Sequence, residues 1–316
     1  MIIKKIIRRL IIFLIASILL IITLFGQRDI PLDLLKKKYA NSHSSFISLD
    51  GMSVHYRDEG NVTDSIPLVL IHGTGASLHT FDSWTKILKN DRRIIRMDLP
   101  GYGLTGPFAD RNYSIKNYVL FLKKFLIGLG IKQCVIGGNS LGGQIAWNYT
   151  LENKEMVNKL ILVDAAGYPV LSKSTPIIFK IAKIPIIKNI FTYITPRFVV
   201  KSSVKNVYFD KNKVNDIIVD RYFELGLREG NRQAFIDRFS IKSDTKTYLN
   251  INEIEQPTLI LWGSEDYLIP LKTAKKFQKD LPNNTLVIIK DVGHIPMEEQ
   301  SIQSAEIVLS FLKNTL

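Results

Sequence analysis

The chain has 316 residues, and 46% of them are hydrophobic, so it can bury a sizeable core as one large α/β domain or two smaller ones. Its single cysteine, Cys134, excludes an intrachain disulfide and any site built from several cysteines. The five histidines include no pair at metal-ligand spacing, so no metal is expected.

The net charge of +13 is unevenly distributed. Four basic residues lie within the first nine positions, and seven more lie between Asp164 and Asp210, a stretch without acidic residues. These basic residues are interleaved with Ile, Phe and Pro and form no nucleic-acid-reading motif, so no nucleic-acid partner is expected. The two segments indicate either basic solvated surfaces or faces turned toward an anionic membrane.

The N-terminus combines basic residues with the apolar run Leu10–Phe25. This pattern predicts a single-pass membrane anchor over residues 1–26, with the N-terminus in the cytoplasm and the folded body on the non-cytoplasmic side. A cleaved signal sequence followed by export is the alternative, although no A-x-A-like site follows the run. Residues 27–45 are expected to form a linker.

From residue 46 onward, short apolar runs alternate with segments of helix length. The runs that predict strands are 46–49, 52–57, 67–71, 93–97, 133–137, 160–163, 257–262 and 285–289. The segments that predict helices are 79–90, 114–129, 141–152, 271–280 and 300–314. Eight strands joined mostly by helical crossovers predict an α/β fold with a mostly parallel sheet covered on both faces.

The stretch 167–248 interrupts this alternation. It contains four prolines and several helical pieces but no clear strand, and strands resume at 257. We therefore expect a core made of 46–166 and 249–316, with 167–248 inserted as a helical cap over one end of the sheet.

Glycines surround one serine in the stretch GGNSLGG, residues 137–143. Gly138-Asn139-Ser140-Leu141-Gly142 lies where a predicted strand meets a predicted helix. G-x-S-x-G in this setting is typical of a nucleophile elbow, a strained turn that exposes the serine hydroxyl. Ser140 is therefore the candidate nucleophile.

A serine nucleophile requires a base and an acid that orients it. His294 is the only histidine after Ser140, and it lies just beyond the predicted strand 285–289. Asp266, after strand 257–262, is the preferred acid, and Asp164, after strand 160–163, is the alternative. The backbone N–H groups of Thr74 and Leu141 are expected to stabilise the oxyanion, while His72 and Asp98 are interpreted as structural.

Five motifs in this order, HGTGAS, DLPGYGLTG, GNSLGG, GSEDYLIP and GHIPME, resemble those of the α/β-hydrolase superfamily over nearly all of 46–316. The resemblance implies an eight-stranded sheet and a cap that covers the substrate pocket. A serine at position 140 argues against the branches that use aspartate there. The N-terminal run makes the chain similar to membrane-bound monoacylglycerol lipases and related bacterial esterases.

The expected activity is hydrolysis of a lipid-like carboxylic ester through an acyl-enzyme, a mechanism that needs no cofactor. A C–C bond hydrolase, an amidase, an acyltransferase, a cofactor-free haloperoxidase and a non-catalytic ligand-binding protein remain alternatives, because the fold serves all of these. The expected partners are a small-molecule or lipid ester and a membrane, contacted by the N-terminal segment and by the basic, apolar cap stretch from Thr175 to Phe198.

Overall fold

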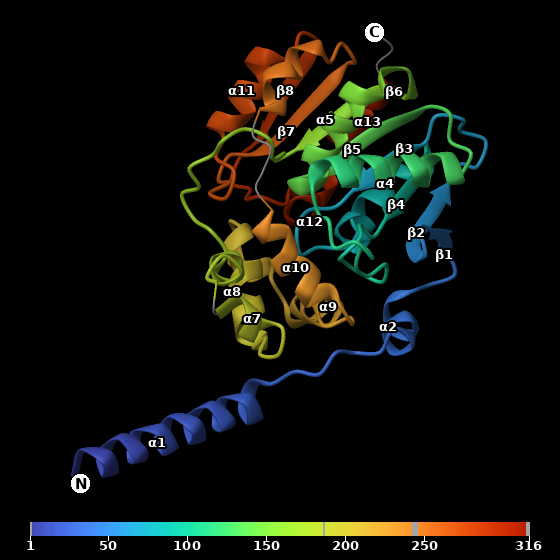
Figure 1. Cartoon of the computed structure of the whole chain (residues 1–316). Coiled ribbons are helices and arrows are strands. Elements are labelled where there is room, and N and C mark those ends of the chain that lie inside the picture. Colours follow the sequence, from blue (N-terminus) through green and yellow to red (C-terminus); the bar gives the residue numbers. More distant parts are fainter. Residues whose placement is uncertain (1, 186, 242–245, 314–316) are drawn as a thin grey trace.

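The structure, a computed structural model, describes residues 2–185, 187–241 and 246–313. Its centre is an eight-stranded sheet with the strand order β1-β2-β4-β3-β5-β6-β7-β8 (Figure 1). The first strand pairs antiparallel with β2, which is also antiparallel to β4, and all later neighbours are parallel. The eight strands are β1 (Ser44–Leu49), β2 (Met52–Gly60), β3 (Leu68–Ile71), β4 (Arg93–Met97), β5 (Cys134–Asn139), β6 (Val157–Val163), β7 (Thr258–Gly263) and β8 (Asn284–Ile289). The predicted fold class is confirmed.

Side chains of the central strands alternate between two hydrophobic clusters, one on each face of the sheet. In β3, Val69 and Ile71 belong to one cluster, whereas Leu68 and Leu70 belong to the other. Helices α4 (Ile115–Gly128) and α5 (Leu141–Glu152) pack on the first face, and α3 (Asp82–Leu88) and α13 (Ser301–Lys313) pack on the second. Because both faces are covered, the central strands are apolar on both sides, as the sequence of β3 requires.

The helices of this layered body follow the predicted segments closely. They are η1 (Leu78–Phe81), α3 (Asp82–Leu88), α4 (Ile115–Gly128), α5 (Leu141–Glu152), η2 (Lys154–Met156), α11 (Lys272–Asp280), α12 (Pro296–Glu299) and α13 (Ser301–Lys313).

Between β6 and β7, the described residues form helices and loops and no strand. Helices α7, α8, α9 and α10 gather at one end of the sheet (Figure 1). The elements of this segment are α6 (Ile177–Ile181), α7 (Ile187–Phe191), α8 (Arg197–Val207), η3 (Lys211–Lys213), α9 (Asp216–Gly226), α10 (Asn231–Ser240) and η4 (Thr247–Glu253). The predicted bounds of the cap, 167–248, and of the two-part core stay a prediction; below, the helical segment between β6 and β7 is called the cap.

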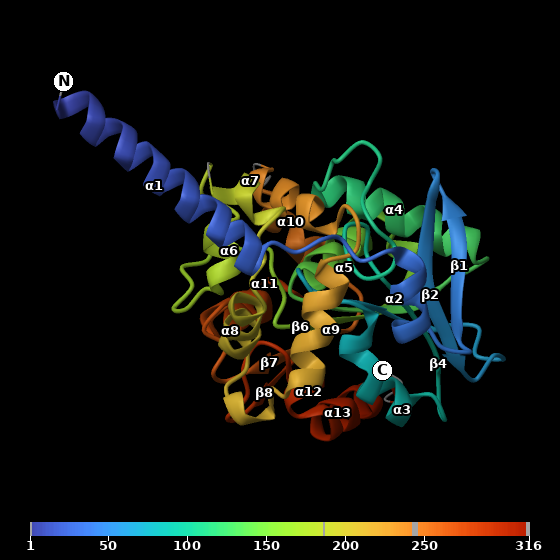
Figure 2. The same cartoon turned by 90° about the horizontal axis from the view of Figure 1, so that it is seen from below.

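Helix α1 (Ile2–Phe25) projects away from the folded body in both views (Figures 1 and 2). Among the described residues, no helix has both the length and the apolarity needed to cross a membrane, so the single-pass anchor expected over 1–26 is not confirmed. Residues 27–45, expected as a linker, contain helix α2 (Leu32–Tyr39). The chain between α1 and α2 lies against the cap, where bridges join Gly26 to Ile194 and Ile30 to Arg228.

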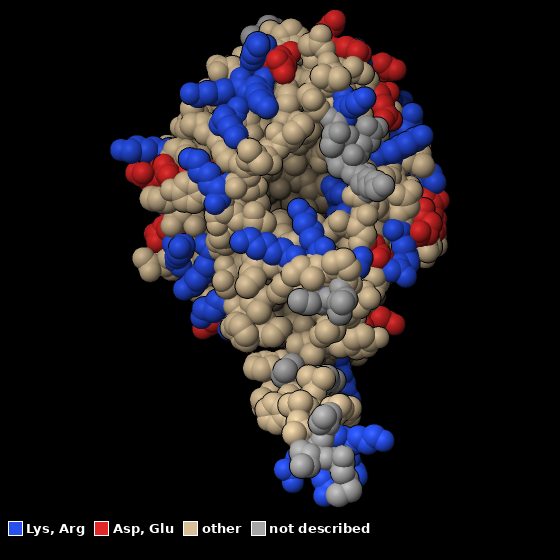
Figure 3. Space-filling model, turned by 60° about the vertical axis from the view of Figure 1, so that its left-hand side comes forward, with Lys and Arg blue, Asp and Glu red and all other residues tan. Residues whose placement is uncertain are grey.

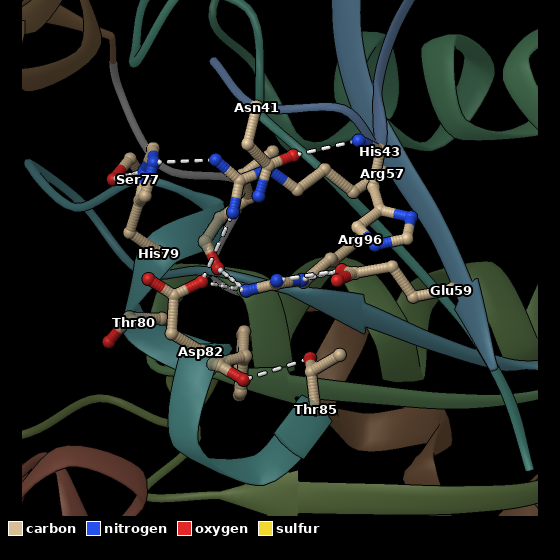
Figure 4. A network of polar contacts seen from close by, with 12 residues as sticks. Asn41, His43, Arg57, Glu59, Ser77, His79, Thr80, Asp82, Thr85 and Arg96 are labelled. Atoms are coloured by element: carbon tan, nitrogen blue, oxygen red, sulfur yellow. Dashed lines mark hydrogen bonds and ion pairs between the residues drawn. The ribbon is translucent and has the colours of Figure 1, made fainter. Parts of the chain in front are cut away.

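A network of buried polar side chains joins β2, β4 and the η1–α3 segment (Figure 4). Arg96 donates to Glu59 Oε2 from both Nε (3.1 Å) and Nη2 (2.7 Å), and it forms an ion pair with Asp82. Arg57 Nη1 also donates to Asp82 Oδ1, at 3.3 Å. The acidic partners offset the cost of burying two guanidinium groups.

His79 belongs to the same network, with Arg57 Nη2 3.1 Å from its Nε2. Burial lowers the pKa of His79 to about 4; Asp98 and Asp82 oppose this shift, and the Arg57 cation adds to it. His79 is therefore neutral in the folded protein over a pH range in which an unfolded histidine is protonated.

We expect acidification to destabilise the fold through His79. Since its folded pKa is depressed, the unfolded state binds a proton first as the pH falls below about 6.5. The loss in the free energy of unfolding between pH 7.5 and pH 5 should reach about 2 kcal/mol from this residue. Urea unfolding at both pH values should show a weaker pH dependence for His79→Gln, whereas the exposed control His43→Gln should behave as the wild type. Equal pH dependence in all three proteins would contradict this assignment.

Candidate active site

Ser140 lies at the sharp turn between β5 and α5. Its backbone adopts φ 55° and ψ −115°, a region that non-glycine residues rarely occupy. Two backbone hydrogen bonds hold the turn: Ser140 N donates to Val163 O (3.1 Å), and Ala166 N donates to Ser140 O (3.0 Å). The strained turn predicted from GGNSLGG is therefore present.

Two glycines beside Ser140 are required by the close approach of helix and strands. A Cβ on Gly142 would lie 2.1 Å from the carbonyl oxygen of Ile71, and one on Gly138 would lie 2.2 Å from the carbonyl carbon of Gly142. Both partners are backbone atoms, which cannot move aside as a flexible side chain could. The glycines thus allow α5 to begin directly above the ends of β3 and β5.

Asp266 and His294 come from the loops after β7 and β8 and lie in contact. Asp266 Oδ2 is 2.7 Å from His294 Nδ1, and Asp266 Oδ1 accepts hydrogen bonds from the backbone N–H groups of Leu268 (2.8 Å) and Ile269 (2.9 Å). Both side chains are buried. Because a carboxylate oxygen accepts hydrogen bonds, the contact orients the imidazole with its proton on Nδ1 and leaves Nε2 free to act as a base.

Asn139 connects the serine turn to the histidine loop, a role that sequence analysis did not assign. Its Nδ2 donates to the carbonyl oxygens of His294 (3.0 Å) and Val163 (3.2 Å). No hydrogen bond between Ser140 Oγ and His294 occurs among the described residues. Such bonds often form only when substrate is bound, and the Asn139 contacts keep the two loops adjacent.

Asp164, the alternative acid, lies beside the Asp266–His294 pair. Potential ligand atoms of the three residues all lie within 4.8 Å of one another. Asp164 is fully buried; Gly263 N donates to its Oδ1 (3.1 Å), and its Oδ2 has no partner among the described atoms. Burial, together with the neighbouring Asp266 carboxylate, raises the pKa of Asp164 well above its usual range, so Asp164 carries a proton.

The same three residues could be considered as metal ligands. However, Nδ1 of His294 faces Asp266 Oδ2 at hydrogen-bond distance and carries the proton of that bond, so it has no lone pair to offer. A protonated Asp164 is also a poor ligand. The donor set therefore fits an acid–base pair with a neutral third carboxyl group.

Of the two expected oxyanion donors, Leu141 directly follows Ser140, and Thr74 follows Gly73, on which a Cβ would lie 3.1 Å from the Cβ of Ser140. Leu141 is the first residue of α5, so its N–H has no partner within the helix. The loop that carries Thr74 is held by His72, whose Nδ1 contacts Gly73 O (2.8 Å) and whose Nε2 accepts from Leu99 N (2.9 Å). Burial lowers the pKa of His72. A neutral imidazole held by two hydrogen bonds agrees with the interpretation of His72 as a structural residue.

A cavity of about 110 Å³ extends from the Thr74 loop beneath the cap. Its walls are mainly apolar side chains of the cap, among them Ile178, Phe179, Phe191, Val204 and Phe235. It also contains Arg232, which sequence analysis did not single out. Such a space suits an aliphatic chain, which would contact the apolar walls, better than water, which would find few hydrogen-bond partners there.

The cap is tied to the loop that carries His294. His294 N donates to Val207 O at 2.8 Å, and the Glu299 carboxylate accepts from the backbone N–H groups of Gly293, Phe209 and Asp210.

The neighbouring Glu298 accepts hydrogen bonds from Thr80, Tyr208, Arg221 and Tyr222. These contacts couple the position of the cavity to that of the candidate base.

Comparison with known proteins places this site in a broad context. Residues 68–307 match the family model described as the alpha/beta hydrolase family. The chain is 28% identical to the uncharacterized hydrolase YugF of Bacillus subtilis, with 84% of this chain and 96% of that protein covered. It is 27% identical to a 2-hydroxy-6-oxo-6-(2'-aminophenyl)hexa-2,4-dienoic acid hydrolase of Metapseudomonas resinovorans (84% and 90% covered) and 26% identical to Lipase 1 of Psychrobacter immobilis (81% and 79% covered).

Solved structures show the same fold. A meta-cleavage product hydrolase from Pseudomonas fluorescens aligns with a TM-score of 0.74 at 23% identity and covers 85% of this chain and 97% of its own. A membrane phospholipase A described as a bacterial virulence factor aligns with a TM-score of 0.70 at 21% identity and covers 98% of both chains.

We expect Asp164→Asn to retain most of the activity, because the amide is uncharged and similar in size to the protonated carboxyl group that it replaces. Asp266→Asn should lose about 10⁴-fold in kcat, since the neutral amide favours the wrong tautomer of His294. The measurement is kcat against pH for both variants on one chromogenic substrate. A loss for Asp164→Asn as large as that for Asp266→Asn would show that Asp164 acts in its charged form.

Proposed function

Because the chain belongs to the alpha/beta hydrolase family, we propose that it is a serine hydrolase that cleaves carboxylic esters with an apolar acyl part. The observation that carries the proposal is the 2.7 Å contact between His294 Nδ1 and Asp266 Oδ2, in a loop joined by Asn139 to the strained Ser140 turn. The apolar cavity that begins at Thr74 supports an aliphatic substrate.

The proposed reaction begins when Ser140 Oγ attacks the ester carbonyl carbon and its proton passes to His294 Nε2. The carbonyl oxygen becomes an oxyanion, which the N–H groups of Thr74 and Leu141 stabilise. The bond to the leaving alcohol then breaks, and His294 returns its proton to that alcohol. In the second half, His294 deprotonates water, the hydroxide attacks the acyl carbon, and Ser140 leaves as the restored alcohol.

Hydrolysis of a C–C bond is the second candidate, because a relative of comparable identity is named as a dienoic acid hydrolase. It would use the same three residues but a vinylogous diketone acid as substrate. The two candidates differ in the bond broken, so a substrate panel distinguishes them.

The test of ester hydrolysis combines a fluorophosphonate probe with p-nitrophenyl esters of two to twelve carbons. We expect covalent labelling and turnover that rises with chain length, and a loss of about 10³-fold or more for Ser140→Ala. Ser202→Ala, on the exposed surface of α8, is the matched control and should be unchanged. A wild-type protein that turns over no ester would refute this function, and turnover of only a diketone acid would support C–C hydrolysis.

We also propose that α1 and the cap bind an anionic lipid surface. Helix α1 exposes large apolar side chains, including Leu10 (63%) and Phe13 (73%), and its first turns carry four basic residues. On the cap, Ile190, Tyr193 and Phe198 are also exposed. Phe25 packs edge-on against Phe198 with ring centroids 6.0 Å apart, so the two apolar surfaces adjoin. Exposed apolar area of this extent favours a lipid partner.

Vesicle flotation tests the lipid proposal. The wild type should float with vesicles that contain anionic lipid and less with purely zwitterionic ones, because basic residues contribute about 1 kcal/mol each near an anionic surface. The double variant Phe13→Asp, Leu14→Asp should lose most of the flotation, whereas Val62→Asp, at an exposed loop remote from α1 in sequence, should not. Equal flotation of both variants would contradict the proposal.

A further inference from the structure

The cap cavity contains one charged side chain among its described lining residues, Arg232. Arg232 is the second residue of α10, is only 7% exposed, and lies among aliphatic and aromatic side chains. No acidic residue lines the described cavity. A cation in such a place costs free energy unless an anion accompanies it.

The segment between α1 and α2 accepts hydrogen bonds from part of the Arg232 guanidinium. Nη2 donates to Gln27 O (2.9 Å) and to Asp29 Oδ1 (2.7 Å). The Asp29 side chain is 41% exposed, so solvent screens this ion pair. These bonds explain how α10 holds the segment that leads to α1.

The remaining nitrogen donors of Arg232 have no such partner among the described atoms. Nε and Nη1 are buried and have no hydrogen-bond partner among the described atoms. An adjacent polar group is in the same state: Asn231 Nδ2 donates to Gly103 O (3.1 Å) and Leu225 O (2.9 Å), but its Oδ1 has no partner. Buried polar atoms in folded proteins are nearly always paired, so these atoms indicate a ligand group.

Anchoring of the N-terminal segment alone does not require this arrangement. One nitrogen, Nη2, donates to both Gln27 O and Asp29 Oδ1. The guanidinium of Arg232, however, has five N–H bonds in all, and it lies at the cavity wall. A guanidinium is the side chain best suited to bind carboxylate or phosphate oxygens through several donors.

We propose that Arg232 binds an anionic group of the substrate, a carboxylate or a phosphate, while the apolar part of the same molecule fills the cavity. This inference deepens the proposed ester hydrolysis and rests on it. The substrate class is then an anionic amphiphilic ester rather than a neutral one.

The distribution of charged side chains on one face of the molecule favours the same class. Figure 3 shows Lys and Arg side chains bordering a hollow, with most Asp and Glu side chains toward the edges of that face. Clustered positive charge raises the local concentration of anionic ligands.

The first experiment compares two esters of the same chain length. These are p-nitrophenyl octanoate and the mono-p-nitrophenyl ester of suberic acid, which ends in a carboxylate. We expect wild-type kcat/KM to favour the suberate ester, and Arg232→Met to lose about tenfold to a hundredfold on that ester alone, mainly through KM. Arg232→Lys should restore part of the preference, and Asp29→Asn should keep it.

A second pair of substrates distinguishes an anion on the acyl side from one on the alcohol side. Lysophosphatidic acid and the monoacylglycerol with the same acyl chain differ only in a phosphate on the alcohol. A dependence on Arg232 in this pair, and not in the suberate pair, would locate the bound anion on the leaving group.

Binding provides a test that does not depend on turnover. In the Ser140→Ala protein, octyl phosphate should raise the melting temperature more than octanol does, and the added Arg232→Met substitution should abolish the difference. If esters are hydrolysed but neither charged substrate nor octyl phosphate depends on Arg232, the anion site is wrong and the proposed function stands. If octyl phosphate binds through Arg232 but no ester is cleaved, the anion site stands and the proposed function is wrong.

Discussion

The close approach of helix α5 to strands β3 and β5 is the constraint on which the candidate site depends. Gly138 and Gly142 leave no space for a Cβ, and this contact sets the turn that gives Ser140 its positive φ. The same turn positions the two neighbours of Ser140. The Asn139 side-chain amide donates to the carbonyl oxygen of His294, and Leu141 is the first residue of α5, with a backbone N–H that has no partner within the helix. One steric contact therefore positions the nucleophile, an oxyanion donor and the link to the base.

Residue type alone does not make such a site, as a second Ser–His–Asp arrangement shows. His55 Nδ1 lies 2.7 Å from Asp98 Oδ2, and His55 Nε2 lies 2.9 Å from Ser44 Oγ. Yet Ser44 Oγ already accepts hydrogen bonds from Arg57 Nε and Asn41 N. Asp98 also accepts from Leu78 N and Leu104 N, so this arrangement holds two turns together. The serine separates the two arrangements, because Ser140 lies on a strained turn before a helix, whereas Ser44 is the first residue of strand β1.

The cap contributes a wall, a charge and a mechanical link. Its apolar side chains line the cavity, Arg232 is the one charged side chain among the described lining residues, and Glu298 and Glu299 join the cap to the loop of His294. The segment between α1 and α2 contacts the same cap through Arg232. A lipid surface bound by α1 would therefore lie next to the part of the protein that receives the substrate.

Much of the fold was predictable because strand and helix periodicities are local. The predicted strands agree with the observed ones to within about three residues, and helix α5 begins and ends where expected. Helix α2 was missed because its eight residues carry three lysines and a weak apolar pattern, and Leu35 is buried only through a tertiary contact. The expected anchor over 1–26 was inferred from composition, and the described structure does not confirm it.

By itself, the sequence determined the sheet, the helical insertion and the glycine-flanked Ser140, since each depends on residues close together in the chain. Only the tertiary structure decided which acid contacts His294, because Asp164 and Asp266 both follow strands and differ only in which loop reaches the imidazole. It also brought Asn139 to the histidine loop and left two Arg232 donors unpaired beside an apolar cavity. Such contacts join residues far apart in sequence. The burial of a side chain such as Asp164 also determines whether it carries a charge, and no local sequence pattern encodes this.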